Sequence, residues 1–259
     1  MAVPYKAPVK DIVFGYEVID SYNVLNKISA FSDFSEDIVI PTMEECAKFS
    51  EEVLAPINAI GDQQGATIKD GVVTMPEEFV DAYQKFAEAG WASISLPSDI
   101  GGGGMPITLS GGTLEILSTA NLAFGLAPGL SAGAISAINF HGSQEQKDKF
   151  LPKLVSGEWT GTMNLSEPQS GSDLGTITTK AEPQEDGSYK ITGTKVWITF
   201  GEHNMTENII HLVLAKVPGS PEGTKGISMF IVPKYTVNDD GSVGDSNNVS
   251  CISIEEKLG

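Results

Sequence analysis

The feature that most constrains the fold is a change of hydrophobic periodicity near Trp159 in this chain of 259 residues. Apolar residues before Trp159 recur at helical spacing, whereas those after it alternate or form short runs between turn residues, as in β-strands. Helices and strands are therefore grouped in two halves, which excludes a chain of alternating βαβ units. We expect an α+β fold with an N-terminal helical domain over residues 1–158 and a β domain over residues 159–259.

Capping residues and prolines predict where the helices of the first half begin and end. Four helical regions are expected: one from a capping box of Thr42 and Glu45 behind Pro41, one from Pro76 to Gly90, an apolar pair within 107–140 broken near Pro128, and one from Ser143, capped with Gln146, to Gly157. In the second half, Asp186-Gly187 predicts a hairpin turn. Further strands are expected at residues 176–181, 188–192, 195–199, 209–217, 227–232 and 249–254, with a polar loop at 238–248.

Two segments of the first half have an alternative interpretation. Residues 116–144 contain no Asp, Glu, Lys or Arg, so a membrane-spanning helix is one interpretation. Their Ser, Thr, Asn and Gly content around Pro128 favours a buried helix instead. The four glycines at 101–104 suggest a phosphate-binding loop, but no Lys-Ser/Thr pair or strand–GxGxxG–helix unit accompanies them. We therefore expect a flexible surface loop, and ATPase or nicotinamide chemistry has no support.

Charge and motif content exclude several classes of function. The chain carries 34 acidic and 16 basic residues, a net charge of −18, which excludes a nucleic-acid binder and docking on anionic membranes through a basic patch. Two distant cysteines and the absence of metal-ligand spacing or a GxSxG elbow predict no disulfide framework, metal site or serine hydrolase. Each of the three histidines is expected to be a satisfied core or surface residue. No apolar leader is visible at the N-terminus, so we expect a cytoplasmic location.

The segment at residues 162–173 (Thr-Met-Asn-Leu-Ser-Glu-Pro-Gln-Ser-Gly-Ser-Asp) is a candidate ligand site. It reads as a short strand that runs into a Pro- and Gly-containing turn rich in hydroxyl groups. Gly171 permits a close approach that a side chain would block, and free N–H groups at such a turn can hold an anion. Taken alone, the segment fits an ordinary polar turn equally well.

A second segment, read together with the first, indicates a protein family. Residues 192–201 read Thr-Gly-Thr-Lys-Val-Trp-Ile-Thr-Phe-Gly, and residues 166–173 read Ser-Glu-Pro-Gln-Ser-Gly-Ser-Asp. Together they resemble the acyl-CoA dehydrogenase family, which carries T-E-P-x-x-G-S-D followed by N-G-x-K-x-W-I-T-N-G. Ser166 replaces the common Thr, and Phe200 replaces the common Asn. Residues 5–11 and 201–215 resemble a bacterial branch of the family that includes 3-methylmercaptopropionyl-CoA dehydrogenases.

This resemblance implies a fold and an activity. The expected fold is an N-terminal α-helical domain, an antiparallel β-barrel and a C-terminal four-helix domain, of which this chain has the first two. The implied reaction is FAD-dependent α,β-dehydrogenation of an acyl-CoA thioester to the 2-enoyl-CoA. The family's catalytic base is a glutamate of the third domain, so no catalytic residue is assigned here and this fragment is expected to be inactive alone. The alternatives are a non-catalytic binding module with the same two domains and an acyl-CoA oxidase.

The resemblance also implies partners and site residues. The expected partners are an acyl-CoA substrate, electron-transfer flavoprotein or a similar acceptor, and further copies of the chain. Thr199 would donate to the N5 atom of the flavin, Ser172 would also approach the CoA part of the substrate, and Glu167 would belong to the loop rather than accept a proton. The implied flavin-binding residues are Met163, Leu165, Ser166, Gly171, Ser172, Trp197, Ile198 and Thr199.

Overall fold

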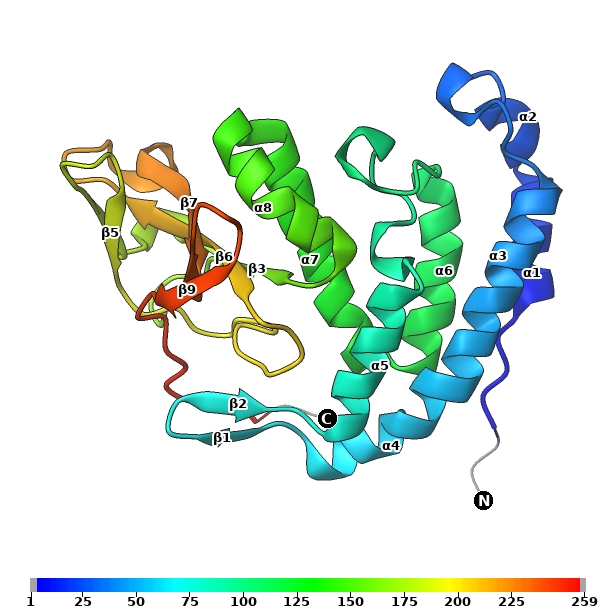
Figure 1. Cartoon of the computed structure of the whole chain (residues 1–259), viewed down its shortest axis with the longest axis horizontal. Helices are drawn as coiled ribbons and strands as arrows, with labels where there is room; N and C mark the ends of the chain where they lie inside the picture. Colours follow the sequence, from blue (N-terminus) through cyan, green and yellow to red (C-terminus); the bar gives the residue numbers. More distant parts are fainter. Residues whose placement is uncertain (1–3, 257–259) are drawn as a thin grey trace.

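The computed structural model describes residues 4–256, so the outermost residues of both predicted domains, 1–3 and 257–259, lie outside it. Figure 1 shows the helices of the first half side by side and the strands of the second half gathered beyond α7 and α8. The helices are α1 (Val9–Val18), α2 (Ser21–Leu25), α3 (Glu36–Phe49), α4 (Ala55–Gln64), α5 (Glu77–Glu88), α6 (Ile107–Ala120), α7 (Leu122–His141) and α8 (Gln144–Ser156). Helices precede strands except for a small β1–β2 hairpin (Thr67–Lys69 and Val72–Thr74), so the predicted grouping is confirmed.

Two hydrophobic cores hold these elements together. The first lies among the helices and includes Met43 of α3, Phe86 of α5 and Phe124 of α7. The second joins α7 and α8 to the β half, and Trp159 lies in it with only 1% of its surface exposed. Trp159, at which the sequence periodicity changes, therefore packs where the two halves meet.

The predicted start of α3 is wrong. The helix begins at Glu36, and Pro41 lies inside it. The hydroxyl of Thr42 donates to the carbonyl of Ile38 at 2.7 Å, one helical turn back, and does not cap a new helix. Val39, which precedes the predicted start, is fully buried. Burial of this upstream apolar face outweighs the local capping signal and the backbone hydrogen bond that Pro41 removes.

The predicted break between α6 and α7 is also wrong. The two helices separate at Asn121, and Pro128 lies within α7. The Asn121 side chain accepts from the backbone N–H of Phe124 at 3.0 Å and donates to the carbonyl of Leu54 at 3.2 Å. A capping side chain with a second partner on another element fixes the boundary more strongly than Pro128 does.

Other helix ends are confirmed. Both bonds of the Ser143–Gln146 capping box are present, and α8 ends at Gly157 in the left-handed conformation. At residues 101–104, the N–H of Gly103 donates to the carbonyl of Ser93 at 2.8 Å. A Cβ atom on Gly102 would lie 2.2 Å from the carbonyl oxygen of Leu96. Residues 101–104 are therefore a surface loop, as expected, and these glycines let it pack closely against residues 93–96.

The main sheet is mixed, so the antiparallel barrel that the family resemblance implies is wrong in strand direction. Strand β6 is central: β7 runs antiparallel along one edge, while β3 and β4 both pair parallel to it. Hydrophobic periodicity carries no information on strand direction, and the turn after β3 does not fold back as a hairpin. The strands are β3 (Thr160–Asn164), β4 (Lys180–Pro183), β5 (Tyr189–Thr192), β6 (Ile209–Lys216) and β7 (Ile227–Pro233), with a separate β8–β9 pair (Tyr235–Val237 and Val243–Ser246).

Individual strand predictions had mixed outcomes. The hairpin at Asp186-Gly187 is confirmed, because β4 and β5 pair across it and Gly187 has a positive φ of 82°. β6 and β7 are confirmed within one residue at each end. The first predicted strand of the hairpin begins only at Lys180, since residues 174–176 form a 3₁₀ turn. Residues 195–199 and 249–254 are not strands, and β9 lies within the predicted loop at 238–248.

Within residues 4–256, α7 is the single helix long and apolar enough to span a membrane by length and composition. One face of α7 packs on β3: the hydroxyl of Ser131 accepts from the N–H of Gly161 at 3.0 Å. Its other face leaves Leu122, Leu126 and Phe140 exposed. We propose that α7 is a core helix of a water-soluble protein. Expression without detergent should yield soluble, folded chain, and recovery in the membrane fraction alone would contradict the proposal.

Candidate functional site

The two motif segments singled out in the sequence lie against each other. The N–H of Val196 donates to the carbonyl of Ser166 at 2.9 Å, and the hydroxyl of Thr162 donates to the carbonyl of Thr199 at 2.8 Å. The turn that follows β3 and the segment 195–201 therefore form one continuous surface.

A buried ion pair holds this junction. The ammonium group of Lys195 lies 2.8 Å from a carboxylate oxygen of Glu167, and their side chains are 7% and 2% exposed. Lys195 also donates to the carbonyl of Leu165 at 3.0 Å. The carboxylate of Glu167 accepts further hydrogen bonds from the N–H groups of Thr178 and Thr179 at 2.7 and 3.0 Å. Each motif contributes one partner, so the ion pair joins the two segments.

These partners set the charge state of Glu167. Burial alone would raise the pKa of its carboxyl, but the hydrogen bonds from Lys195, Thr179, Thr178 and Gln169 together lower that pKa well below its ordinary value. Glu167 is therefore a carboxylate with its oxygens already engaged. This supports the expectation that it belongs to the loop and does not accept a proton.

The lowered pKa predicts a pH dependence of stability. A carboxyl with a lowered pKa in the folded state stabilises the fold above its unfolded-state pKa of about 4.3 and loses that contribution as the pH falls. The difference in free energy of unfolding between the wild type and Glu167→Gln should therefore narrow below about pH 4.3. Urea denaturation between pH 7 and pH 3 measures it, with Glu185→Gln, at an exposed position between β4 and β5, as the control. A difference that stays constant over this range would contradict the prediction.

The segment 195–201 is a loop because its backbone turns twice. Trp197 and Phe200 have positive φ values of 61° and 50°, which a β-strand cannot contain. The ring of Phe200 packs against the helical core and lies 6.0 Å from the ring of His203. This packing offsets the conformational cost of a bulky residue in the left-handed region, where the family's common Asn is better tolerated.

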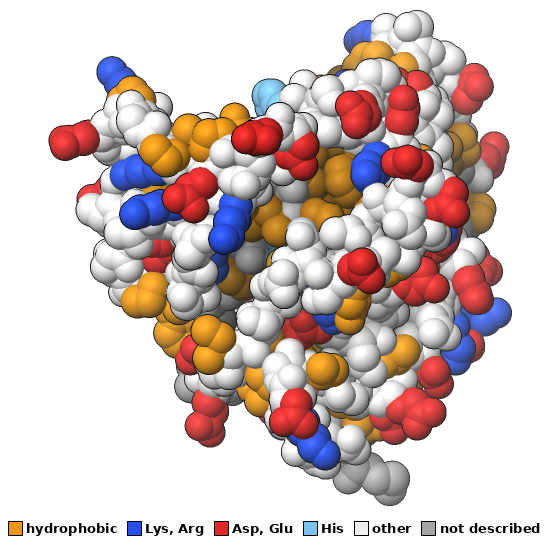
Figure 2. All heavy atoms as spheres, turned by 60° about the vertical axis from the view of Figure 1, so that its left-hand side comes forward, with side chains coloured by type: hydrophobic (Ala, Val, Ile, Leu, Met, Phe, Trp, Pro, Cys, Tyr) orange, Lys and Arg blue, Asp and Glu red, His pale blue; other side chains and the backbone are white. Residues whose placement is uncertain are grey.

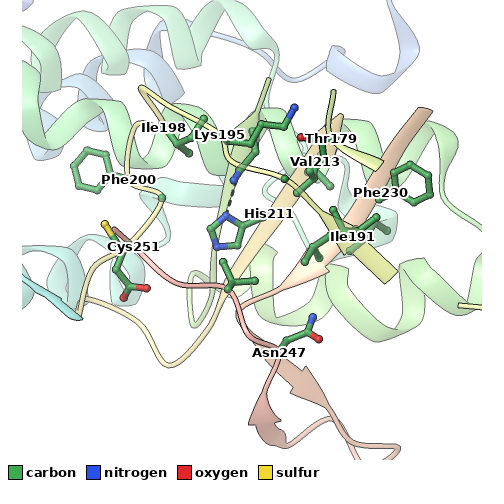
Figure 3. A pocket seen from close by; sticks show the side chains of 18 of the residues that line it. Thr179, Ile191, Lys195, Ile198, Phe200, His211, Val213, Phe230, Asn247 and Cys251 are labelled. Carbon is green, nitrogen blue, oxygen red and sulfur yellow. Dashed lines mark hydrogen bonds between the residues drawn. The ribbon is translucent and has the colours of Figure 1, made fainter. Parts of the chain in front are cut away.

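A cavity of about 1490 Å³ opens beside this loop. Trp197, Ile198 and Thr199 line it, together with residues from β5, β6, β7 and the irregular segment 247–255. Figure 2 shows a hollow in the molecule with hydrophobic side chains inside it and charged side chains around it. Figure 3 shows the cavity from close by, with Ile198 and Phe200 on one side and Ile191 and Phe230 on the other. A cavity of this size accommodates a ligand much larger than a metabolite of a few atoms.

The structure brings together only part of the predicted site. Five of the predicted residues do not line the cavity: Met163 of β3, and Leu165, Ser166, Gly171 and Ser172 of the turn that follows it. That turn is hydrogen-bonded to the segment 195–201, which does line the cavity. A Cβ atom on Gly171 would lie 3.7 Å from the Ser166 hydroxyl oxygen, an ordinary contact, and its φ is not positive. The chain's own packing therefore does not require a glycine at position 171. That a ligand approaches Gly171 closely stays a prediction.

Sequence reasoning missed the polar pair His211 and Asn164. Both side chains are buried, and the Nδ1 atom of His211 lies 3.2 Å from the side-chain oxygen of Asn164. Alternation along β6 was the available signal, since it places His211 and Val213 on one face of the strand. Among the described residues, no group of three or more His, Cys, Asp or Glu side chains could hold a metal ion.

Comparison with known proteins identifies the family. Models of the acyl-CoA dehydrogenase N-terminal and middle domains match residues 41–158 and 162–258. The chain is 44% identical to 3-methylmercaptopropionyl-CoA dehydrogenase of Ruegeria pomeroyi, over 98% of this chain and 43% of that protein. It is 38% identical to a butyryl-CoA dehydrogenase of Syntrophomonas wolfei, over 98% and 42%. The chain thus spans less than half the length of these curated relatives.

A solved structure gives the same result for the fold. The acyl-CoA dehydrogenase of Bacillus anthracis, crystallised in complex with FAD, matches with a TM-score of 0.63 and 27% sequence identity, over 79% of this chain and 32% of that one. The sequence motifs, the paired domain models and this structural match all indicate the same family. The chain belongs to the acyl-CoA dehydrogenase family.

Proposed function

We propose that this chain binds FAD and an acyl-CoA thioester as part of an enzyme that carries out α,β-dehydrogenation to the 2-enoyl-CoA. The observation that carries the proposal is the junction of the two family motifs. The ion pair between Lys195 and Glu167 joins the motif turn (residues 165–173) to the Trp-Ile-Thr loop (residues 195–201). The Trp-Ile-Thr loop lines the large cavity. The ion pair fixes the backbone of both segments, as a preorganised cofactor site requires.

The residues present fit a flavin. Trp197 and Ile198 offer apolar surface for a flat ring, and the half-buried Thr199 offers a hydroxyl donor at the same wall. Bound FAD would supply the hydride acceptor of the reaction. Ser166 and the exposed Ser172 would provide hydroxyl groups along the turn, with Ser172 also toward the CoA part of the substrate.

The proposal also covers the catalytic base, the electron acceptor and the substrates. Glu167 is held by Lys195 and two backbone N–H groups, so we assign it no part in proton transfer. We assign no catalytic base in this chain, because the resemblance implies that the base is a glutamate of the family's third domain. We propose electron-transfer flavoprotein or a similar protein as the electron acceptor, and association with further copies of the chain. Acyl-CoA thioesters with short chains, including butyryl-CoA and 3-methylmercaptopropionyl-CoA, are the substrates to test first, since these are named for the two relatives described above.

Flavin binding tests the proposal directly. Thr199→Val and Trp197→Ala should each weaken FAD binding about three- to tenfold, because each removes one hydrogen bond or one flat apolar contact. Flavin fluorescence during FAD titration measures the dissociation constants. Thr192→Val is the matched control, since Thr192 is exposed at the end of β5 and does not line the cavity. Equal affinity in all four proteins would show that this loop does not bind the cofactor.

A further inference from the structure

The middle of the central strand carries a buried histidine with one unused nitrogen. His211 is 1% exposed and its Nε2 atom has no hydrogen-bond partner. Ile210 and Leu212, its neighbours along β6, belong to the core shared with α7 and α8. Side chains alternate along a strand, so the ring of His211 lies on the other face of β6 from Ile210 and Leu212. His211 is among the residues that line the cavity, as are Leu212 and Val213.

The bond at the other ring nitrogen fixes which hydrogen bond is missing. Nδ1 of His211 lies 3.2 Å from Oδ1 of Asn164, and an amide oxygen can only accept. Nδ1 therefore carries the proton, and Nε2 presents a lone pair. Burial, reinforced by the charge of Lys234, lowers the pKa of His211 to about 4, so the ring is neutral at physiological pH. Nε2 is thus an acceptor that lacks a donor.

The second buried histidine shows that burial alone does not produce this state. His203 is equally buried, yet both of its ring nitrogens are paired. Its Nε2 lies 3.0 Å from the hydroxyl oxygen of Thr160, and its Nδ1 accepts from the N–H of Met205 at 3.2 Å. Buried polar atoms in folded proteins are normally paired in this way. The unused nitrogen of His211 therefore points to a partner that the chain itself does not supply.

The surroundings of His211 indicate the chemistry of that partner. Figure 3 shows His211 near the centre of the labelled side chains, with Val213 and Ile191 on one side and Cys251 on the other. Most of these neighbours are apolar, and the Trp-Ile-Thr loop lines the same cavity. A ligand here needs an apolar body and an N–H or O–H donor. A flavin has both, since its fused ring is flat and apolar while its imide N–H and ribityl hydroxyls donate.

We propose that Nε2 of His211 accepts a hydrogen bond from an N–H or O–H group of a flavin bound in this cavity. His211 is then a cofactor-binding residue, and Asn164 is a positioning residue that fixes the tautomer. This inference rests on the proposed function, because it takes the flavin as the occupant.

Nitrogen NMR of the two buried histidines provides the test. In long-range ¹H–¹⁵N spectra of the ¹⁵N-labelled chain, His211 should show a protonated Nδ1 and an unprotonated Nε2. His203 should show the opposite tautomer, with the proton on Nε2. Saturating FAD should shift the Nε2 signal of His211 toward the hydrogen-bonded range and leave His203 unchanged. Riboflavin should cause the same shift if the donor lies on the ring or ribityl chain. A shift with FAD alone would place the donor at the adenosine end.

Two substitutions make the test quantitative. His211→Leu removes the acceptor and should weaken FAD binding about three- to tenfold, while His211→Gln keeps an oxygen acceptor and should restore part of that loss. Circular dichroism checks that both variants fold. If FAD binds but neither the Nε2 signal nor the affinity changes, a buried water is the partner and the inference is overturned. If FAD does not bind at all, the proposed function fails and this inference fails with it.

Discussion

Replacing Lys195 by Met should lower the free energy of unfolding by about 3–5 kcal/mol, the usual effect of removing one partner from a buried ion pair. The ammonium group lies 2.8 Å from Glu167, and neither side chain is more than 7% exposed. Without it, the carboxylate remains buried with hydrogen bonds but no counter-charge. Chemical denaturation followed by circular dichroism measures the loss.

Two controls distinguish burial from the mere presence of an ion pair. Lys153→Met removes the ion pair with Glu158, whose partners are 36% and 53% exposed, and should cost at most about 1 kcal/mol. The double variant Glu167→Gln, Lys195→Met removes both charges and should recover part of the loss. Equal losses for Lys195→Met and Lys153→Met would show that the junction pair does not contribute as a buried interaction.

Replacing Trp159 by Ala should lower the free energy of unfolding by about 3–5 kcal/mol, the typical cost of truncating a buried aromatic side chain. Trp159 is 1% exposed in the core that joins α7 and α8 to β6. Its indole N–H has no hydrogen-bond partner. Trp159→Phe should therefore cost clearly less than Trp159→Ala, because it keeps most of the apolar contact and removes an unpaired donor. The same denaturation experiment compares them, and equal losses would contradict the prediction.

Sequence reasoning succeeded where the two interacting groups are close in the chain. Ser143 and Gln146 lie three residues apart, and Asp186 and Gly187 are adjacent, so their cap and turn were predictable. The start of α3 was wrong because burial of Val39 against other helices decides it. The parallel pairing of β3 with β6 was missed because it joins segments far apart in the chain.

In the candidate site too, local motifs were predictable and contacts between distant residues were not. Resemblance located both motif segments, including Trp197 and Thr199, which the cavity brings together. The ion pair between Glu167 and Lys195 was not predicted, although each residue lies within a motif. Its partners are 28 residues apart, and only the folded turn reveals that they meet. Pairwise contacts of this kind have no local pattern in a single sequence.

The central position of β6 has a consequence for the order of events during synthesis. Of the described strands, β3 pairs only with β6, and β7 also takes its pairing from β6. When the ribosome has released β3 but not yet Ile209, the helical half can assemble and α7 can cover one face of β3. The edge of β3 that pairs with β6 then remains without a partner until β6 emerges. An unpaired strand edge can pair with another chain and cause aggregation. Translation speed across residues 165–209 should therefore affect the yield of folded chain more than translation speed across the helical half does.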